Sequence, residues 1–288
     1  MGIILSKDAF VDLHVHTKIS DGTYTPEEVV QLAAQEGIQV LAITDHDEVA
    51  GIKRAKKEAK NHSIKIISGI ECSTTFEHGT RHILGYNINP DDIRLQKYIK
   101  TQKIAREEKI KKILNNLDAL GMKISFEDVQ KYAEIGVMGR PHIAQALKEK
   151  GYVSTIAEAF DLYIGKDKPA YASGRVTTPE EVIKVIRAAG GIPVLAHPFQ
   201  MKFSSYEEME SEMERLVAMG IKGIEIIYPE HTTEQTYKLI VFAATHKLHV
   251  TAGSDFHGQN KQNRLGYCFA KEGKLTIRCI GGLGKTFI

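Results

Sequence analysis

Short apolar runs alternate with amphipathic helical segments along most of this 288-residue chain. Two helical segments, Thr25–Glu36 and Pro179–Ala189, start at a Thr-Pro-Glu-Glu sequence and are followed by Gly37 and Gly190. A threonine N-cap, a proline and acids in the first turn, and a C-terminal glycine are strong signals of helix boundaries. Repeated strand–helix units favour a parallel α/β architecture, and a barrel in particular. The runs expected to form strands are Phe10–Val15, Val40–Thr44, Ile64–Gly69, His82–Tyr86, Ile192–Ala196, Gly223–Ile227 and His249–Gly253.

Residues 97–172 interrupt this alternation, because no strong strand pattern occurs in them. Ile99–Leu120 predicts a long charged helix, in which the cationic stretch Lys103–Lys112 interleaves acids and is interpreted as a solvated face. Further helices are predicted at Phe126–Tyr132, Pro141–Glu149 and Thr155–Tyr163. We therefore expect three segments along the chain: a first part of the barrel at 1–96, a small helical insert at 97–172 and a second part of the barrel at 173–288.

The composition limits the class of protein. A hydrophobic content of 42% is ample for a buried core, and a formal net charge of +2 is too small by itself to indicate a polyanion-binding surface. The three cysteines, Cys72, Cys268 and Cys279, form no CxxC pair, which argues against a disulfide framework and against a thiolate zinc site. No apolar N-terminal signal and no stretch of 18 apolar residues occurs. We expect a cytoplasmic, soluble protein without membrane association or a stable protein partner.

Side chains that can bind metals recur at or just after the C-terminal ends of the apolar runs. His14 and His16 alternate on a predicted strand, so both face the same side, and Asp21 follows where the strand becomes a loop. Because α/β barrels assemble their active sites at the C-terminal rim, we expect these groups to meet there. His82 differs, since it opens its apolar run, and the spacing does not support its reach to that rim. The other groups of this kind are His46 in Thr-Asp-His-Asp, Glu71 in Gly-Ile-Glu, His197 in Ala-His-Pro, and Asp255 and His257 in Ser-Asp-Phe-His.

This mixture of residues indicates an open catalytic metal site. Imidazole suits Zn, Mn and Fe, and a carboxylate can bridge two cations, for which Glu71 is the obvious candidate. A structural zinc site would be closed by four ligands and commonly contain cysteine. The sequence therefore predicts a metal-dependent hydrolase with more than one ion.

The motifs, taken in order, resemble those of the PHP (polymerase and histidinol phosphatase) family. They read DLHVHTxxSDG, TDHD, GIE, H, AHP and SDFH, and they lie on both sides of the insert. The resemblance implies an α/β fold, a distorted (β/α)7 PHP barrel with a small all-helical insert domain. The Gly-Arg-Pro-His sequence at Gly139–His142 is similar to that of the branch containing nucleoside 3',5'-bisphosphate phosphatases, whose bacterial relatives also trim short RNA from the 5' end.

Carried over residue by residue, the resemblance implies two or three divalent metal ions, with Mn predominant and Fe or Zn as alternatives. The implied ligands are His14, His16, Glu71 and Asp255 for the first ion, Glu71, His82 and His197 for the second, and Asp21, His46 and His257 for the third. The residues expected to carry catalysis are Asp21, His46, Glu71, His197, Asp255 and His257.

Four residues of the insert are candidates for binding substrate. Arg140 is the strongest, because a guanidinium forks onto two phosphate oxygens and the segment begins a helix whose free N–H groups favour anions. The alternative is a surface arginine beside a capping turn. His142 contacts phosphate or the leaving group, or is a solvated histidine of the first turn. Lys168 and Tyr171 lie in the return segment, which lines the cleft in the family or acts as a hinge. Arg175 is a weaker candidate of the same kind.

The leading expectation is a metal-dependent phosphoesterase that acts on a nucleotide phosphate. Its substrate would be the 3'-phosphate of a nucleoside 3',5'-bisphosphate, together with the 5' end of short RNA. One alternative is a histidinol-phosphatase-type enzyme for small molecules, which needs an acid for the substrate's ammonium group. Another is a non-catalytic PHP binding module, although the chain is too short for one attached to a polymerase. A stand-alone amidohydrolase would leave Arg140 without an obvious purpose.

Overall fold

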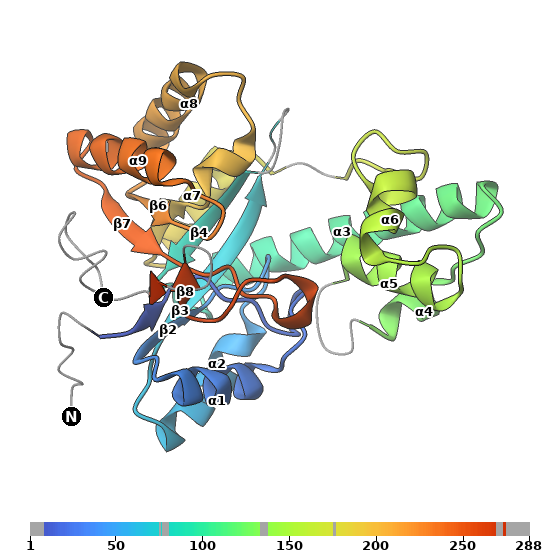
Figure 1. Cartoon of the computed structure of the whole chain (residues 1–288), viewed down its shortest axis with the longest axis horizontal. Helices are drawn as coiled ribbons and strands as arrows, with labels where there is room; N and C mark the ends of the chain where they lie inside the picture. The colour runs from blue at the N-terminus through green and yellow to red at the C-terminus, as the bar shows by residue number, and fades with distance from the viewer. Residues whose placement is uncertain are drawn as a thin grey trace.

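Seven strands form one sheet in sequence order, which the helices surround (Figure 1). The computed structural model describes residues 9–74, 76, 81–132, 138–174, 177–268 and 273–274. The strands of this sheet are β1 (Val11–Asp12), β2 (Val40–Ile43), β3 (Lys65–Thr74), β4 (Arg81–Tyr86), β5 (Ile192–Leu195), β6 (Gly223–Ile227) and β7 (His249–Ala252).

The two edges of the sheet approach each other. Beyond β1, Val15 forms a parallel bridge with Phe256, and the Leu13 N–H donates to the Ala252 carbonyl at 3.2 Å. The His16 N–H donates to the Phe256 carbonyl at 2.9 Å. The result is a nearly closed barrel, which confirms the fold expected from the sequence.

Strand β4 runs against its neighbours. All other adjacent strands of the barrel are parallel, whereas β4 is antiparallel to both β3 and β5. The parallel arrangement expected from the repeated strand–helix units therefore does not hold at this strand. The physical reason is the connection of six residues between Thr74 and Arg81, because a parallel crossover needs a dozen or more. The reversal puts His82, at the start of β4, opposite Ser73 near the end of β3, so it reaches the rim that its spacing did not support.

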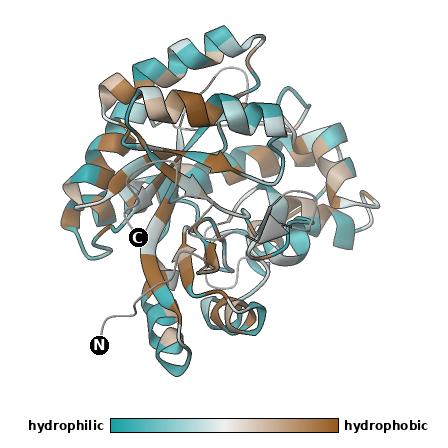
Figure 2. Ribbon diagram, turned by 60° about the vertical axis from the view of Figure 1, so that its left-hand side comes forward, coloured by the Kyte–Doolittle hydropathy of each residue, from teal (hydrophilic) through white to brown (hydrophobic). Residues whose placement is uncertain are grey.

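Helices with clear caps cover the outside of the barrel. The helices α1 (Pro26–Glu36) and α7 (Pro179–Ala188) are capped at their N-termini by Thr25 and Thr178, each of which forms a capping box. Gly37 ends α1 with a left-handed φ of 79°, a conformation that glycine adopts without strain. Apolar strands fill the interior, and the polar faces of the helices point outward (Figure 2). The remaining helices around the barrel are α2 (Ala50–Glu58), α8 (Tyr206–Met219) and α9 (Thr233–Thr245).

Short elements complete this part of the chain. The 3-10 turns are η1 (Ala59–Asn61), η3 (Pro198–Met201) and η4 (Gly258–Asn260), and a separate two-stranded ladder is formed by β8 (Tyr267–Cys268) and β9 (Gly273–Lys274). None of the helices in the described residues is long and apolar enough to cross a membrane.

The helix α3 (Ile93–Ala119) connects the barrel to a helical region (Figure 1). Its first turns, with Leu95 and Ile99, belong to the barrel's core, whereas Ile113 and Leu117 belong to a second core. The helix begins before the predicted boundary at 97 and passes through it. The second core also contains α4 (Phe126–Gln130), α5 (Arg140–Glu149), α6 (Ile156–Ala159) and the π-helical turn η2 (Phe160–Ile164). The division into 1–96, 97–172 and 173–288 stays a prediction.

The chain leaves the barrel and returns to it at neighbouring points. The Gln102 side chain on α3 donates to the Thr177 hydroxyl just before α7, at 2.8 Å. At the other end of α7, the Arg94 guanidinium in the first turn of α3 donates to the Ala188 carbonyl. The first turns of α3 therefore lie alongside α7 and run in the opposite direction.

Candidate metal centre

Glu71, at the rim of the barrel, lies between two sets of imidazoles. Its side chain is 1% exposed. Its Oε1 is 2.9 Å from the Nδ1 atom of His82 and 2.9 Å from the Nε2 atom of His197. Its Oε2 lies within 3.3 Å of ring nitrogens of His14, His16 and His46. One carboxylate thus faces five histidines from four different strands or loops.

A second carboxylate, Asp255, completes a buried group of four side chains. Its Oδ1 is 3.6 Å from the His14 Nε2 atom and 3.3 Å from the His16 Nε2 atom. With Glu71, these residues present one ligand atom each within 4.8 Å of one another. The set is the one implied for a first ion.

A third group lies toward the outside, around Asp21. Its Oδ1 is 3.3 Å from the Nε2 atom of His257, and its Oδ2 is 4.0 Å from the Nε2 atom of His46. The His257 Nδ1 atom is 2.9 Å from the Asp255 carbonyl and can donate to it, which turns Nε2 toward Asp21. His16 also belongs to this group, with its Nδ1 atom 3.7 Å from Asp21. Asp21 is 21% exposed, so this group lies nearest the solvent.

All nine predicted ligands are thus brought together, and strained backbone occurs at two of them and at the residue that follows His46. Asp47, His197 and Asp255, none of them glycine, have positive φ angles of 51°, 23° and 51°. Such conformations cost free energy and persist where the surrounding structure imposes them. All three residues belong to the loops that follow strands at the rim.

The ionised carboxylates of the centre favour the binding of cations. Burial raises the pKa of Glu71, but the positive charges of His82, His46 and His14 outweigh it and hold that pKa well below its usual range. Burial lowers the pKa of His16, and contacts with Asp255 and Glu71 reverse this and raise it to about 9. Asp21 Oδ1 is buried without a hydrogen-bond partner. Buried ionised carboxylates with nitrogen ligands beside them and an unsatisfied oxygen fit a centre that can hold metal ions.

Three cations of the helical region form a cluster beside these residues. We call Arg106, Lys109 and Arg140 the cation cluster. The Arg140 guanidinium lies 5.8 Å from the centroid of the Tyr171 ring, and the Lys109 ammonium lies 5.5 Å from the same centroid. No carboxylate of the described residues pairs with Arg140 or Lys109. Burial, with the charges of Arg140 and Arg106, lowers the pKa of Lys109 to about 8. Such a concentration of positive charge favours an anion.

The cation cluster is joined to the centre at two points. Arg106 pairs with Asp47, the residue after His46. His142 is 8% exposed, so it is not the solvated residue that one interpretation expected. Its Nδ1 atom accepts the Gly139 N–H at 2.9 Å. Burial lowers the pKa of the His142 imidazole, and the negative charge of Asp21 opposes that effect.

Sequence reasoning missed Arg106 and Lys109. The interpretation of Lys103–Lys112 as a solvated face is wrong at these two positions, because they are partly buried and lie three residues apart on one face of α3. The predicted Lys168 is exposed on a turn, and no contact in the described residues joins its ammonium to the cation cluster. Arg175 lies outside the described residues.

A model of the PHP domain matches residues 12–226. The chain belongs to the PHP family. It is 32% identical over 261 residues to the 3',5'-nucleoside bisphosphate phosphatase of Chromobacterium violaceum, covering 89% of this chain and 90% of that protein. It is 33% identical over 246 residues to a 5'-3' exoribonuclease of Haemophilus influenzae, covering 85% and 89%. The family expected from the motifs is therefore confirmed.

Two solved structures agree with the fold. An amidohydrolase from Chromobacterium violaceum, with bound sulfate and no metal, superposes with a TM-score of 0.83 at 29% identity and covers 95% of this chain and 96% of its own. A predicted metal-dependent phosphoesterase of Bifidobacterium adolescentis gives a TM-score of 0.83 at 30% identity, with 97% and 98% covered. The likeness extends over both the barrel and the helical region.

Glu225 is a further residue of this PHP centre that sequence reasoning missed. It is fully buried on β6. Its Oε1 lies 3.0 Å from the Nδ1 atom of His14, and its Oε2 accepts the backbone N–H of His197 at 2.9 Å. A carboxylate in this position orients a metal-binding imidazole. The signal was an acid in the middle of the apolar run Gly223–Ile227.

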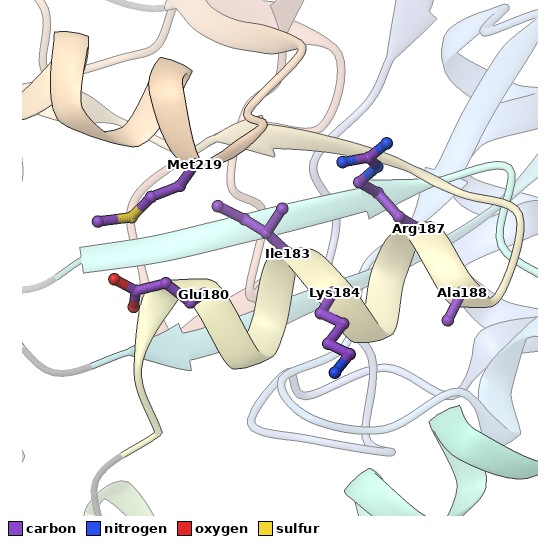
Figure 3. A pocket seen from close by; sticks show the side chains of 6 residues that line it. All are labelled: Glu180, Ile183, Lys184, Arg187, Ala188 and Met219. Carbon is purple, nitrogen blue, oxygen red and sulfur yellow. The ribbon is translucent and has the colours of Figure 1, made fainter.

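A surface hollow between α7 and α8 is separate from the PHP centre (Figure 3). Its volume is about 380 Å³. It is lined by Glu180, Ile183, Lys184, Arg187, Ala188 and Met219. None of these residues belongs to the centre or to the cation cluster, so the hollow has no part in the assignment of function.

Proposed function

We propose that this PHP protein is a metal-dependent phosphoesterase that removes the 3'-phosphate of a nucleoside 3',5'-bisphosphate and also degrades short RNA from its 5' end. The observation that carries the proposal is the cation cluster, which lies beside a centre of buried histidines and carboxylates. Relatives named for both activities match nearly the whole chain and support it. A third relative, a phosphoribosyl 1,2-cyclic phosphate 1,2-diphosphodiesterase of Eggerthella lenta, is 31% identical over 257 residues.

The proposed metal sites follow the three groups of side chains. Imidazole and carboxylate together suit Mn, Fe and Zn, and we propose Mn as the resident ion with the other two as alternatives. Bound divalent ions polarise a phosphoryl oxygen and lower the pKa of coordinated water. The proposed ligands are His14, His16, Glu71 and Asp255, then Glu71, His82 and His197, then Asp21, His46 and His257, with His16 shared.

Different residues of the chain bind different phosphates of the proposed substrate. Asp21, the most exposed of the carboxylates, marks the side from which the reacting phosphate enters. Arg140 and Lys109 bind the phosphate that is not cleaved, and the Tyr171 ring lies against both cations. His142, near Asp21, contacts the reacting phosphate or its leaving oxygen. We assign a further phosphate of a longer substrate to the exposed Lys168.

The same charges disfavour a histidinol-phosphatase-type enzyme. Its substrate carries an ammonium group, which needs an acid close to the phosphate site. Lys109 and Arg140 would instead repel it, because like charges at short range cost free energy.

A panel of four substrates with Mn²⁺ tests the proposal. Adenosine 3',5'-bisphosphate and a 5'-phosphorylated oligoribonucleotide should be hydrolysed, and histidinol phosphate and an acyl amide should react far more slowly. The same panel after treatment with a chelator is the control, and all turnover should be lost. Fastest turnover of histidinol phosphate or of the amide would contradict the proposed substrate. No turnover of any of the four by the fully loaded protein would contradict the enzymatic proposal.

A further inference from the structure

The two oxygens of Asp255 have different surroundings. Oδ1 faces the imidazoles of His14, His16 and His257 at 3.3–3.6 Å. Oδ2 points away from them and has two donors. The Tyr228 hydroxyl donates to it at 2.9 Å, and the Lys261 ammonium at 2.5 Å.

These two donors differ in burial and in support. Tyr228 is fully buried, and its hydroxyl accepts a hydrogen bond from the Gln200 side chain at 2.7 Å. Lys261 has a side chain that is 37% exposed, on the loop after η4. Because Tyr228 already satisfies Oδ2 from inside the protein, the lysine is not needed to satisfy that oxygen.

The loop that carries Lys261 is tied to the centre on both sides. The Asn260 side chain donates to the Asp21 carbonyl at 2.8 Å. The Asn263 side chain donates to the Ser254 carbonyl at 2.8 Å. These bonds hold the backbone of the loop beside the most exposed carboxylate, while the lysine side chain keeps rotatable bonds and access to solvent.

We infer that Lys261 is a phosphate-binding residue of the centre and that its contact with Asp255 is a resting position. The inference rests on the proposed function. The ammonium is attracted by the carboxylates of Asp255, Glu71 and Asp21, which are the groups that cations neutralise when the centre is loaded. With cations bound, the attraction of the Lys261 ammonium to these carboxylates weakens, and a phosphate at the centre supplies a new negative charge for it to bind. Tyr228 still holds Oδ2 after the lysine has moved.

The competing explanation is that Lys261 only fixes the carboxylate of Asp255. Tyr228→Phe is the matched control, because it removes the other donor to the same oxygen and removes no charge. A role limited to fixing Asp255 predicts the same effects from both substitutions, whereas phosphate binding predicts different ones.

The experiment titrates inorganic phosphate into the Mn²⁺-loaded protein by calorimetry. All variants carry Arg140→Ala, which weakens the cation cluster so that the titrated phosphate reports on the centre. Lys261→Met, Lys261→Arg and Tyr228→Phe are compared, with metal content measured by mass spectrometry and folding by thermal melting. We expect Lys261→Met to raise the phosphate Kd by about tenfold, the loss expected for one hydrogen bond to a charged group. Lys261→Arg should recover part of the affinity, and metal content should be unchanged in both.

Two results would overturn the inference. One is a phosphate Kd for Lys261→Met equal to that of its parent. The other is an equal loss of metal from Lys261→Met and Tyr228→Phe, which would assign the lysine to fixing Asp255 alone. Failure of the proposed function is distinguishable, because the unsubstituted protein, with Arg140 intact, would then show no turnover of the bisphosphate or the RNA while phosphate binding persists.

Discussion

Glu225 sets the direction of an imidazole without reaching the substrate side of the centre. Because the Nδ1 atom of His14 faces Glu225, its Nε2 atom faces Glu71 and Asp255. The same carboxylate holds the backbone of His197, in the group on the other side of Glu71. One buried residue thus supports two groups of proposed ligands.

Replacement of this carboxylate should weaken metal binding. Glu225→Gln keeps the size of the side chain and loses its charge, so we expect metal affinity to fall by about 10- to 100-fold, the usual effect of losing a partner of this kind. Competition with a fluorescent chelator measures it. Asp12→Asn is the control, since Asp12 is also fully buried but accepts from the Ser254 hydroxyl and from the backbone N–H groups of Gly266 and His14 rather than facing an imidazole. An equal loss in both variants would reject the role of Glu225.

Lys109 should destabilise the free protein at neutral pH. Its pKa of about 8 lies below the ordinary lysine value, so between pH 8 and about 10.5 the unfolded chain binds more protons than the folded one. Stability therefore rises with pH across that window. Lys109→Met should raise the Tm at pH 7 by about 2–4 °C, corresponding to about 1 kcal/mol, and the gain should disappear near pH 10.5.

The same substitution should raise the KM for the bisphosphate, because a phosphate contact is lost. Thermal melts at pH 7 and pH 10.5, with steady-state kinetics, provide the measurements. Lys103→Met, at an exposed position of the same helix, is the control and should change neither quantity. A gain in Tm that is the same at both pH values would contradict the titration of Lys109.

Eight of the nine proposed ligands were predictable from the residues, because each sits in a motif at or just after the end of an apolar run. Lys109 was not, because which face of α3 turns inward depends on the second core, and alternating charges do not reveal it. His82 was found by resemblance alone. Its position became explicable only with the direction of β4, which is decided by the length of one connection.

At the scale of elements, α3 joins the two cores and also contacts the centre. Its 27 residues span about 40 Å. Tyr98 and Arg106 on α3 both donate to Asp47, which follows His46 in the loop after β2. The reversal of β4 explains why α3 contacts Asp47. The chain leaves β4 at the end of the barrel away from the rim, so α3 has to run back toward the rim.

Loss of the contact with Asp47 should loosen the attachment of α3 to the barrel. Asp47→Asn weakens one partly buried ion pair and one hydrogen bond, so we expect the free energy of unfolding to fall by about 1–3 kcal/mol and the KM for the bisphosphate to rise. Urea denaturation and kinetics measure both. Asp91→Asn breaks the exposed pair with Lys53 and should change stability by less than about 1 kcal/mol. Equal effects of the two substitutions would contradict the proposed attachment.

At the scale of the whole molecule, the barrel encloses a centre whose charges are incomplete without cations. A cation that binds only the folded chain stabilises it by mass action, by about 2.7 kcal/mol when its concentration is one hundred times its Kd. A large cluster of buried apolar side chains surrounds this centre. Metal content should therefore dominate the thermal stability.

Mn²⁺ should raise the Tm by several degrees in a concentration-dependent way, and a chelator should reverse the shift. Differential scanning calorimetry checks this. In Glu71→Gln the shift should be much smaller, because the carboxylate shared by the two inner groups is lost. A Tm that does not respond to Mn²⁺, Fe²⁺ or Zn²⁺ would exclude a resident divalent ion of these kinds.

The hydrogen bond between Gln102 and Thr177 has a consequence for how such enzymes can diversify. It shows that the chain leaves the barrel and re-enters it at neighbouring points. Any segment whose two ends lie equally close together can therefore be inserted there. Exchange of residues 103–176 would leave the strand order and the nine rim side chains in place. Evolution, or a protein engineer, can thus combine the same rim side chains with a different substrate-binding segment.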